Sequence, residues 1–303
     1  MAIYIVSGIA LFCCALTMFL CKRYVRSAFS AIDQVLDRVL HKDMSLTLQT
    51  TGDSRISKLT HKASRIIGMY VSDAAIAETE KETIQGFISD MSHQMKTPLS
   101  GISMYSSLLF EGNLSHEEQQ AFFSRIKAGT EKLQWMMDSL IKMSRLEVGA
   151  IQLSPARADI KQTITDSISG VVAAASKKNI SITVCPMADV ALLHDRKWTV
   201  EAINNVLENA VKYSAMDGHI EVSLERLTLY TKITITDNGI GIAADDYPLV
   251  FKRFYRGHNA KESEGAGLGL YLSALIMEKQ GGYITVDSKP GAYTSFSLFL
   301  QNC

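Results

Sequence analysis

One histidine of this sequence lies in a setting that could make it a nucleophile. His93 stands in the stretch Asp90–Leu99, on a predicted helix, and Pro98 follows it shortly. A proline inside a helix removes one hydrogen bond and costs about 3 kcal/mol, so its presence there is unusual. A neutral imidazole is a good nucleophile near neutral pH, because an ordinary pKa of about 6.5 leaves most of it unprotonated. A lone helical histidine is more often structural or simply exposed, so His93 alone does not define a site.

A second group of polar side chains falls within reach of one face of a predicted helix. It consists of Asn205, Glu208, Asn209 and Lys212. Oxygen ligands suit Mg²⁺, which usually keeps several waters and needs only one or two protein groups beside phosphates. The lysine could meet a phosphate. This spacing is therefore compatible with a magnesium–phosphate site.

Two glycine-bearing segments follow the polar helix. Residues 237–241 end a predicted strand with a carboxylate that can accept a hydrogen bond from an amino group. Residues 264–270 open a predicted helix, where backbone N–H groups beside glycines can approach a phosphate at its positive end. The basic and aromatic segment Phe251–Arg256 lies between them and suits a mobile lid. Each segment alone is weak evidence, since a glycine pair after a strand is more often a turn.

The N-terminal segment predicts a membrane anchor. Residues 1–21 contain no charged side chain, and at about 1.5 Å per residue they would span roughly 30 Å, the thickness of a bilayer core. Lys22, Arg23 and Arg26 follow directly, whereas a secretory signal carries its positive charge before the apolar run. The positive-inside rule then predicts a single-pass protein of the cell membrane with its C-terminal part in the cytoplasm. The alternative, an apolar core helix, is disfavoured by the uninterrupted length.

Helical patterns continue beyond the anchor. Residues 22–83 carry apolar side chains at steps of three and four, which predicts a helical linker that pairs with another helix. A packed hairpin without a signalling role fits this pattern equally well. Residues 84–149 predict a helical hairpin, with a capping box of Ser115 and Glu118 at the start of its second helix and Gly149 at its end. One hairpin buries only part of its apolar stripes and two make a four-helix bundle, so a homodimer is predicted.

Residues 150–303 mix helices and strands and predict an α/β domain. The predicted helices are 159–176, 196–213 with an Asp195 cap, and 268–279, and the predicted strands are 180–184, 220–224, 233–237, 283–287 and 295–299.

The chain has 303 residues, with 31 Lys and Arg against 31 Asp and Glu, which excludes a charge-driven nucleic-acid binder. Its 5 cysteines are spaced like neither a disulfide framework nor a zinc site.

The order of these segments resembles the membrane-bound sensor histidine kinases of two-component systems. The resemblance covers about residues 84–300 and matches five boxes of that family: the phosphoacceptor box at His93, the N box at 205–209, the first glycine box at 237–241, the F box at 251–254 and the second glycine box at 265–269. It implies an α+β protein with a transmembrane helix, a helical-hairpin dimerisation and phosphotransfer domain, and a C-terminal α/β-sandwich ATP-binding domain.

The resemblance also implies an activity and a set of site residues. His93 would accept the γ-phosphoryl group of ATP and pass it to an aspartate of a cognate response regulator. Asn209 would hold Mg²⁺, Asp237 would take the adenine amino group, and Tyr213 would pack against adenine. The full set of implied ATP-binding residues is Asn205, Glu208, Asn209, Lys212, Tyr213, Asp237, Gly239, Gly241, Phe254, Arg256, Gly265, Gly267, Leu268 and Gly269.

Two positions beside the phosphoacceptor bear on the mechanism. Gln94 stands where the family commonly has a carboxylate, which leaves the general base open. Thr97 matches the position that the family uses to orient water when it dephosphorylates a response regulator.

Two alternative functions remain: a degenerate kinase acting as a membrane-anchored scaffold or phosphatase, and a mechanical ATPase of the same nucleotide-binding superfamily. Since little of the chain would lie outside the cell, sensing is expected within the membrane or through a membrane partner.

Overall fold

The computed structural model describes residues 2–40, 55–112, 114–257 and 265–302, which form two compact units. The first unit ends at Gly86 and the second begins at Phe87. Residues 41–54 of the predicted helical linker lie outside the described residues.

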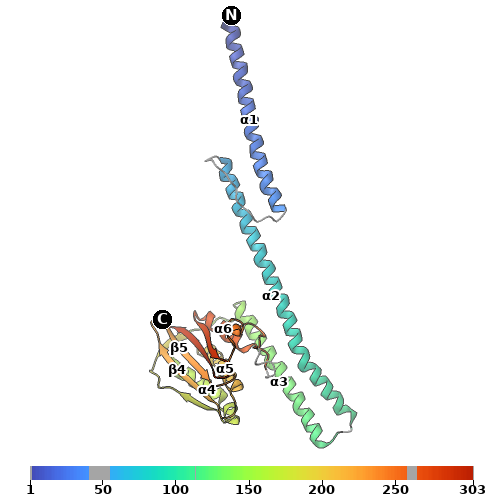
Figure 1. The fold of residues 1–303 in the computed structure, drawn as a ribbon, viewed down its shortest axis with the longest axis vertical. Helices are drawn as coiled ribbons and strands as arrows, with labels where there is room; N and C mark the ends of the chain where they lie inside the picture. The colour runs from blue at the N-terminus through green and yellow to red at the C-terminus, as the bar shows by residue number, and fades with distance from the viewer. Residues whose placement is uncertain (1, 41–54, 113, 258–264, 303) are drawn as a thin grey trace. The chain divides into compact units, whose positions relative to one another are not determined.

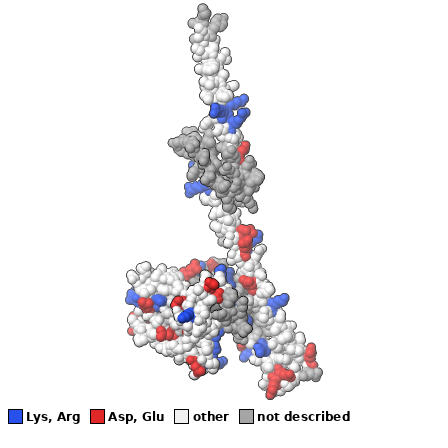
Figure 2. Space-filling model, viewed as in Figure 1, with Lys and Arg blue, Asp and Glu red and all other residues white. Residues whose placement is uncertain are grey.

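The first unit contains helix α1, Ala2–Leu40, and the beginning of helix α2, Arg55–Glu111. Within α1, Ser7–Ser27 is the one stretch of the described residues that is long and apolar enough to cross a membrane, and it overlaps the predicted anchor. Figure 2 shows this part of α1 without charge until the Lys and Arg cluster of Lys22, Arg23 and Arg26. The expected apolar helix followed by positive charge is therefore present.

The second unit opens with the predicted helical hairpin. The C-terminal part of α2 carries Pro98, and helix α3, His116–Glu147, follows. The capping box is confirmed, since the Ser115 hydroxyl accepts from the Glu118 N–H and the Glu118 carboxylate accepts from the Ser115 N–H. Gly149 takes the left-handed conformation expected of a C-terminal stop, with φ +70°.

A glycine brings the two helices of the hairpin close together beside the proline. A Cβ added to Gly129 of α3 would lie 2.9 Å from Ile102 Cγ1 and 3.6 Å from the Pro98 carbonyl oxygen. Pro98 is buried at this crossing. The turn of α2 that follows His93 is thus packed against α3.

The remainder of the second unit is an α/β domain (Figure 1). A five-stranded sheet has the order β2-β4-β5-β7-β6, in which β2 pairs with β4 in parallel and the other neighbours are antiparallel. Its strands are β2 Ser181–Val184, β4 His219–Arg226, β5 Tyr230–Asp237, β6 Tyr283–Lys289 and β7 Tyr293–Gln301. A separate ribbon pairs β1 Ala156–Asp159 with β3 Ala191–His194. The helices are α4 Ile160–Lys177, α5 Arg196–Tyr213 and α6 Gly269–Lys279, with a short 3₁₀ turn, η1, at Ala244–Asp246.

Buried and exposed residues alternate along the strands, and buried residues form stripes along the helices. These patterns explain how the sheet and the helices pack together. Every second residue of β5 is buried, from Thr231 to Asp237, as expected of a sheet with one covered face. Helix α5 buries a stripe that includes Ile203 and Leu207, and α4 buries Ile160 and Ile164. These side chains share one core with Met136, Met143 and Leu146 of α3, so the hairpin and the α/β domain are packed together.

Candidate active site

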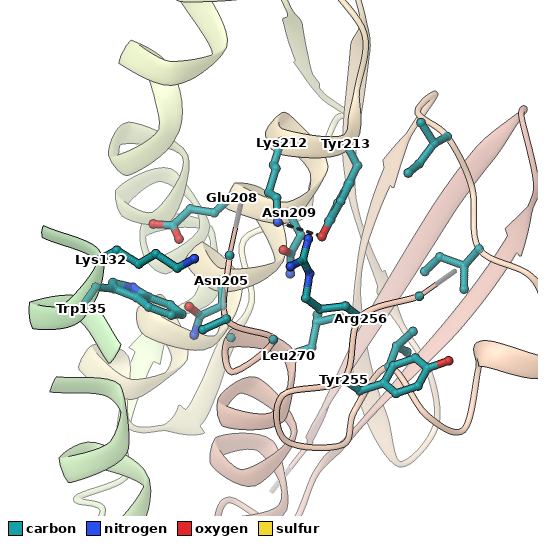
Figure 3. Close-up of a pocket in the computed structure, with 18 of the residues that line it drawn as sticks. Lys132, Trp135, Asn205, Glu208, Asn209, Lys212, Tyr213, Tyr255, Arg256 and Leu270 are labelled. Atoms are coloured by element: carbon teal, nitrogen blue, oxygen red, sulfur yellow. Dashed lines mark hydrogen bonds between the residues drawn. The ribbon is translucent and has the colours of Figure 1, made fainter. Parts of the chain in front are cut away.

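One cavity of about 600 Å³ lies between the α/β domain and the hairpin, both within the second unit. Its α/β side is formed by α5, the segments after β5 and before α6, and the beginning of β7. Its hairpin side includes Thr97 and Pro98 of α2 and Lys132 and Trp135 of α3. The close-up in Figure 3 shows side chains from both sides pointing into the same space.

Helix α5 brings the predicted polar row together. Asn205, Glu208, Asn209, Lys212 and Tyr213 all line the cavity, and the Lys212 ammonium donates to the Tyr213 hydroxyl at 2.8 Å (Figure 3). Loss of water, and next the charge of a neighbouring glutamate, raise the pKa of the Glu208 carboxyl. The predicted single helix face is confirmed.

The end of α5 is fixed from outside the cavity. The Lys178 ammonium donates to the carbonyl oxygens of Val211, Lys212 and Ser214 at 2.9, 2.7 and 3.0 Å. A cation at these terminal carbonyls satisfies groups that the helix leaves unpaired and interacts well with its negative end. Lys178 therefore positions Lys212 and Tyr213 without touching the cavity.

Asp237 ends β5 at the floor of the cavity and is only 3% exposed. Its Oδ1 accepts from the Gly239 N–H at 2.9 Å. Burial raises the pKa of the Asp237 carboxyl to about 6, against the opposing effect of that hydrogen bond. Gly239 is required here, because a Cβ at this position would lie 2.5 Å from the Tyr213 carbonyl oxygen.

The second glycine segment leads into α6. Gly265 and Gly267 have φ of +136° and +70°, and a Cβ at Gly265 would lie 2.7 Å from Lys212 Nζ. No side chain caps the first turn of α6, whose N-cap is Leu268, so its backbone N–H groups are left to another acceptor. Gly265, Gly267 and Gly269 line the cavity, which is the arrangement a phosphate requires.

The predicted lid segment Phe251–Arg256 lies wholly within the described residues and is packed. Phe254 is buried with φ +59°, and its ring lies 5.9 Å from the ring of Phe87 on α2. The Arg253 guanidinium lies 5.0 Å from the Phe87 ring and 4.7 Å from that of Tyr271, and it pairs with Glu147 of α3. Residues 258–264 lie outside the described residues.

The cavity gathers most, but not all, of the predicted site residues. Gly241 and Arg256 line it as well, whereas Gly239, Phe254 and Leu268 are buried and are not among the lining residues. His93 is exposed and Gln94 half-buried, and neither is among the lining residues, although Thr97 one turn further along α2 is. The sequence did not predict the hairpin residues Arg125, Lys132 and Trp135, nor the pair in which the Tyr255 hydroxyl donates to Asp246 at 2.6 Å.

The donor set of α5 fits a magnesium ion bound together with phosphates. Asn205 and Asn209 offer amide oxygens in the cavity, and the Nδ2 atom of Asn205 is buried without a hydrogen-bond partner. Among the described residues no group of three or more His, Cys, Asp or Glu side chains could hold a metal by itself. This donor set suits Mg²⁺, which takes few protein ligands beside phosphate and water.

Family models place both parts of this site. Residues 194–302 match the model for the histidine kinase-, DNA gyrase B- and HSP90-like ATPases, which defines the class of the α/β domain. Residues 83–149 match the model for the His Kinase A (phospho-acceptor) domain. The chain belongs to the sensor histidine kinases, whose two domains it carries in this order.

Individual relatives agree. The chain is 30% identical over 247 residues to the sensor-like histidine kinase SenX3 of Mycolicibacterium smegmatis, covering 80% of this chain and 64% of that protein. It is 31% identical over 219 residues to the sensor protein kinase WalK of Staphylococcus aureus, covering 71% of this chain and 52% of WalK. The chain thus spans less than two thirds of the length of either relative.

Solved structures show the same fold. The Acinetobacter baumannii histidine kinase AdeS superposes with a TM-score of 0.56 at 18% identity, covering 69% of this chain and 98% of AdeS. The histidine kinase ThkA, solved in complex with the response regulator protein TrrA, superposes with a TM-score of 0.60 at 16% identity, covering 78% of this chain and 67% of that chain. The expected fold class, an apolar N-terminal helix, a helical hairpin and a C-terminal α/β domain, is confirmed.

Proposed function

We propose that this chain is an ATP-dependent protein-histidine kinase that phosphorylates its own His93 and passes the phosphoryl group to an aspartate of a response regulator. One observation carries the proposal. A single cavity joins the polar row of α5 and the glycine segment before α6 to Thr97 and Pro98, the turn of α2 directly after His93. A nucleotide held by the α/β domain would thus face the hairpin that bears the acceptor.

The described contacts support a role for each lining group. Asp237 would accept the adenine amino group, with Tyr213 beside the ring, and Lys212 with the N-terminus of α6 would hold the phosphates. Asn209, with Asn205, would hold Mg²⁺. When bound, that ion would supply positive charge to the β- and γ-phosphate oxygens.

The transfer itself needs positioning more than covalent chemistry from the protein. The Nε2 lone pair of His93 would form a bond to the γ-phosphorus while the bond from that phosphorus to the β,γ-bridging oxygen breaks. ADP leaves with the electron pair, and the ring then releases its Nδ1 proton to water. In the second step an aspartate oxygen of the regulator would attack the same phosphorus, and His93 Nε2 would leave with the electron pair of the P–N bond while Nδ1 takes a proton from water.

The remaining expectations concern assembly and location. The hairpin exposes large apolar side chains, which a second hairpin would cover in a four-helix bundle; they include Leu99, Met104, Phe110, Phe123, Met137 and Ile141. The ThkA–TrrA complex supports a response regulator as the partner. The apolar stretch Ser7–Ser27, followed within α1 by the predicted linker, supports a single-pass protein of the cell membrane with residues beyond it in the cytoplasm.

The proposal is tested by incubating the full chain in detergent micelles with γ-labelled ATP and Mg²⁺. The expected result is protein-bound label that is lost in acid and kept in base, as phosphohistidine requires. Acid-stable label would contradict the proposal. ATP hydrolysis without labelled protein would favour a mechanical ATPase instead.

Gln94 is the observation that favours a second candidate, a scaffold or phosphatase without kinase activity. A neutral amide can hold the Nδ1–H of His93 and fix the reactive tautomer, but it stabilises a developing imidazolium less than a carboxylate does. We expect Gln94→Glu to speed self-labelling by up to roughly 10²-fold, the lower end of general-base effects, and Gln94→Ala to slow it. ATP affinity should not change. If Gln94→Ala labels as fast as the wild type, the tautomer role is wrong.

Thr97 lies one helical turn beyond His93 and is exposed at the rim of the cavity. Its hydroxyl would position a water against the phospho-aspartate of a docked regulator. Thr97→Ala should therefore leave self-labelling within about twofold and slow regulator dephosphorylation by roughly 10²-fold. The measurement is the decay of labelled regulator with and without each variant. Equal loss of both activities would indicate a local distortion beside Pro98 instead.

A further inference from the structure

Helix α3 places a cation where its pattern calls for a buried apolar residue. Met136, Ser139, Met143 and Leu146 are its buried residues and form the stripe that faces the α/β domain. Lys132 lies four residues before Met136, at the next position of the same stripe. It is half-buried and lines the cavity. A lysine at such a position keeps its stem against apolar surface and extends its ammonium toward a polar space.

Figure 3 shows where that ammonium points. The Lys132 side chain leaves α3 beside Trp135 and extends across the cavity toward α5, where Asn205 and Glu208 stand. Of the described residues that line the cavity, Arg125 and Lys132 are cations supplied by the hairpin. Lys212 and Arg256 are those supplied by the α/β domain. Positive charge therefore faces the space from both sides.

The geometry points to the γ-phosphate as the ligand of Lys132. On the proposed function, adenine lies at Asp237 and the phosphates extend along α5 toward Asn205 and the hairpin. The phosphoryl group that is transferred must be the one nearest the hairpin, because the acceptor His93 is on α2. We propose that Lys132 is a catalytic residue of the phosphotransfer, donating to a γ-phosphoryl oxygen as the phosphorus moves from ADP to His93 Nε2.

This assignment also explains why the hairpin has to be docked for transfer. Lys132 reaches the cavity only while α3 lies on the α/β domain. That contact is held by the Lys142–Glu201 ion pair at 2.6 Å and by the pairing of Arg253 with Glu147. Charge on the γ-phosphoryl group would be neutralised by Lys132 in the docked arrangement, which is where His93 can receive it.

The test compares ATP with ADP, because only ATP carries the phosphate that Lys132 would contact. In the full chain, Lys132→Met keeps the unbranched stem against Trp135 and removes the charge. We expect the ATP affinity to fall about tenfold, the ADP affinity to stay within twofold, and self-labelling at saturating ATP to fall roughly 10²-fold. Lys132→Arg should restore part of both. Lys127→Met is the matched control on the same helix, since Lys127 is exposed outside the cavity, and it should behave as wild type.

The outcomes separate this proposal from the kinase proposal on which it rests. In one outcome the wild type is labelled on histidine, and Lys132→Met keeps both the wild-type ratio of ATP to ADP affinity and the wild-type rate of self-labelling. This outcome would overturn the role of Lys132 and leave the kinase proposal intact. If affinity for both nucleotides falls together with the melting temperature, Lys132 is structural and its catalytic role is rejected. If the wild type forms no phosphohistidine, both proposals fail.

Discussion

We expect the replacement of His93 by alanine to abolish self-labelling by γ-labelled ATP, while ATP binding and the melting temperature stay at wild-type values. The reason is structural. The His93 side chain is exposed on α2, so its removal opens no hole in the packed core. The nucleotide groups lie on the α/β domain, and His93 is not among the residues that line the cavity. Loss of the nucleophile should therefore remove the product and nothing else.

A second exposed histidine of the same hairpin provides the control. His116 opens α3, is exposed, and has its Nε2 3.1 Å from Nε2 of Gln120 on the same helix. His116→Ala should label at the wild-type rate. Label retained by His93→Ala, in acid-labile form, would show that another histidine is the acceptor. Loss of ATP binding in that variant would show that His93 belongs to the nucleotide site.

Local chemistry explains which elements the sequence predicts well. Helix α5 begins at its predicted residue because the Asp195 carboxylate accepts from the Trp198 N–H, and α3 begins at its capping box. Strand β5 is visible from its alternation. The β1–β3 ribbon was not predicted, because its two strands are four residues each and are held by pairing with each other over a distance in the sequence. Such pairing depends on tertiary structure that periodicity does not report.

The site residues also differ in whether local sequence or tertiary packing brings them to the cavity. The row on α5 and the two glycine segments were predictable, since each is a local arrangement on one element. Lys132 and Trp135 were not, because they join the cavity only when α3 packs on the α/β domain. A signal for them existed in the stripe through Met136, where a lysine interrupts the buried positions. Phe254, which the family resemblance places among the ATP-binding residues, is buried beside Phe87 and is not among the lining residues.

Replacing Asp237 by asparagine should stabilise the fold and weaken ATP binding at the same time. The carboxyl is almost fully buried, and its pKa in the folded chain is about 6. The unfolded value is about 3.9, so the protonated form contributes stability that is complete below pH 4 and is lost as the pH rises through 6. At pH 7.5 the difference between these two pKa values corresponds to about 3 kcal/mol of unfolding free energy lost by burying the charge. The asparagine amide is uncharged, so the variant should not lose this stability.

The expected effect of Asp237→Asn on ATP affinity is opposite in sign to its effect on stability. Asp237 Oδ1 already accepts from the Gly239 N–H, which leaves Oδ2 to accept the adenine amino group. An ionised oxygen is the stronger acceptor, so Asp237→Asn should lose about 10- to 100-fold in ATP affinity at pH 7.5. Acid should act on the wild type in the same way, because a proton on Oδ2 would face another donor. With a pKa of about 6, the affinity should fall roughly tenfold between pH 7.5 and pH 5.

Calorimetric titration with ATP and thermal unfolding at several pH values check both effects on the same samples. The phosphates of ATP also titrate near pH 6, so the informative quantity is the difference between the wild type and Asp237→Asn, which lacks the carboxyl. Asp245→Asn controls for loss of a surface charge, because Asp245 is exposed on η1 and outside the cavity lining. A variant that loses both stability and affinity would make Asp237 a structural residue. Unchanged affinity with a higher melting temperature would instead leave Asp237 as a buried charge without a ligand and place adenine elsewhere.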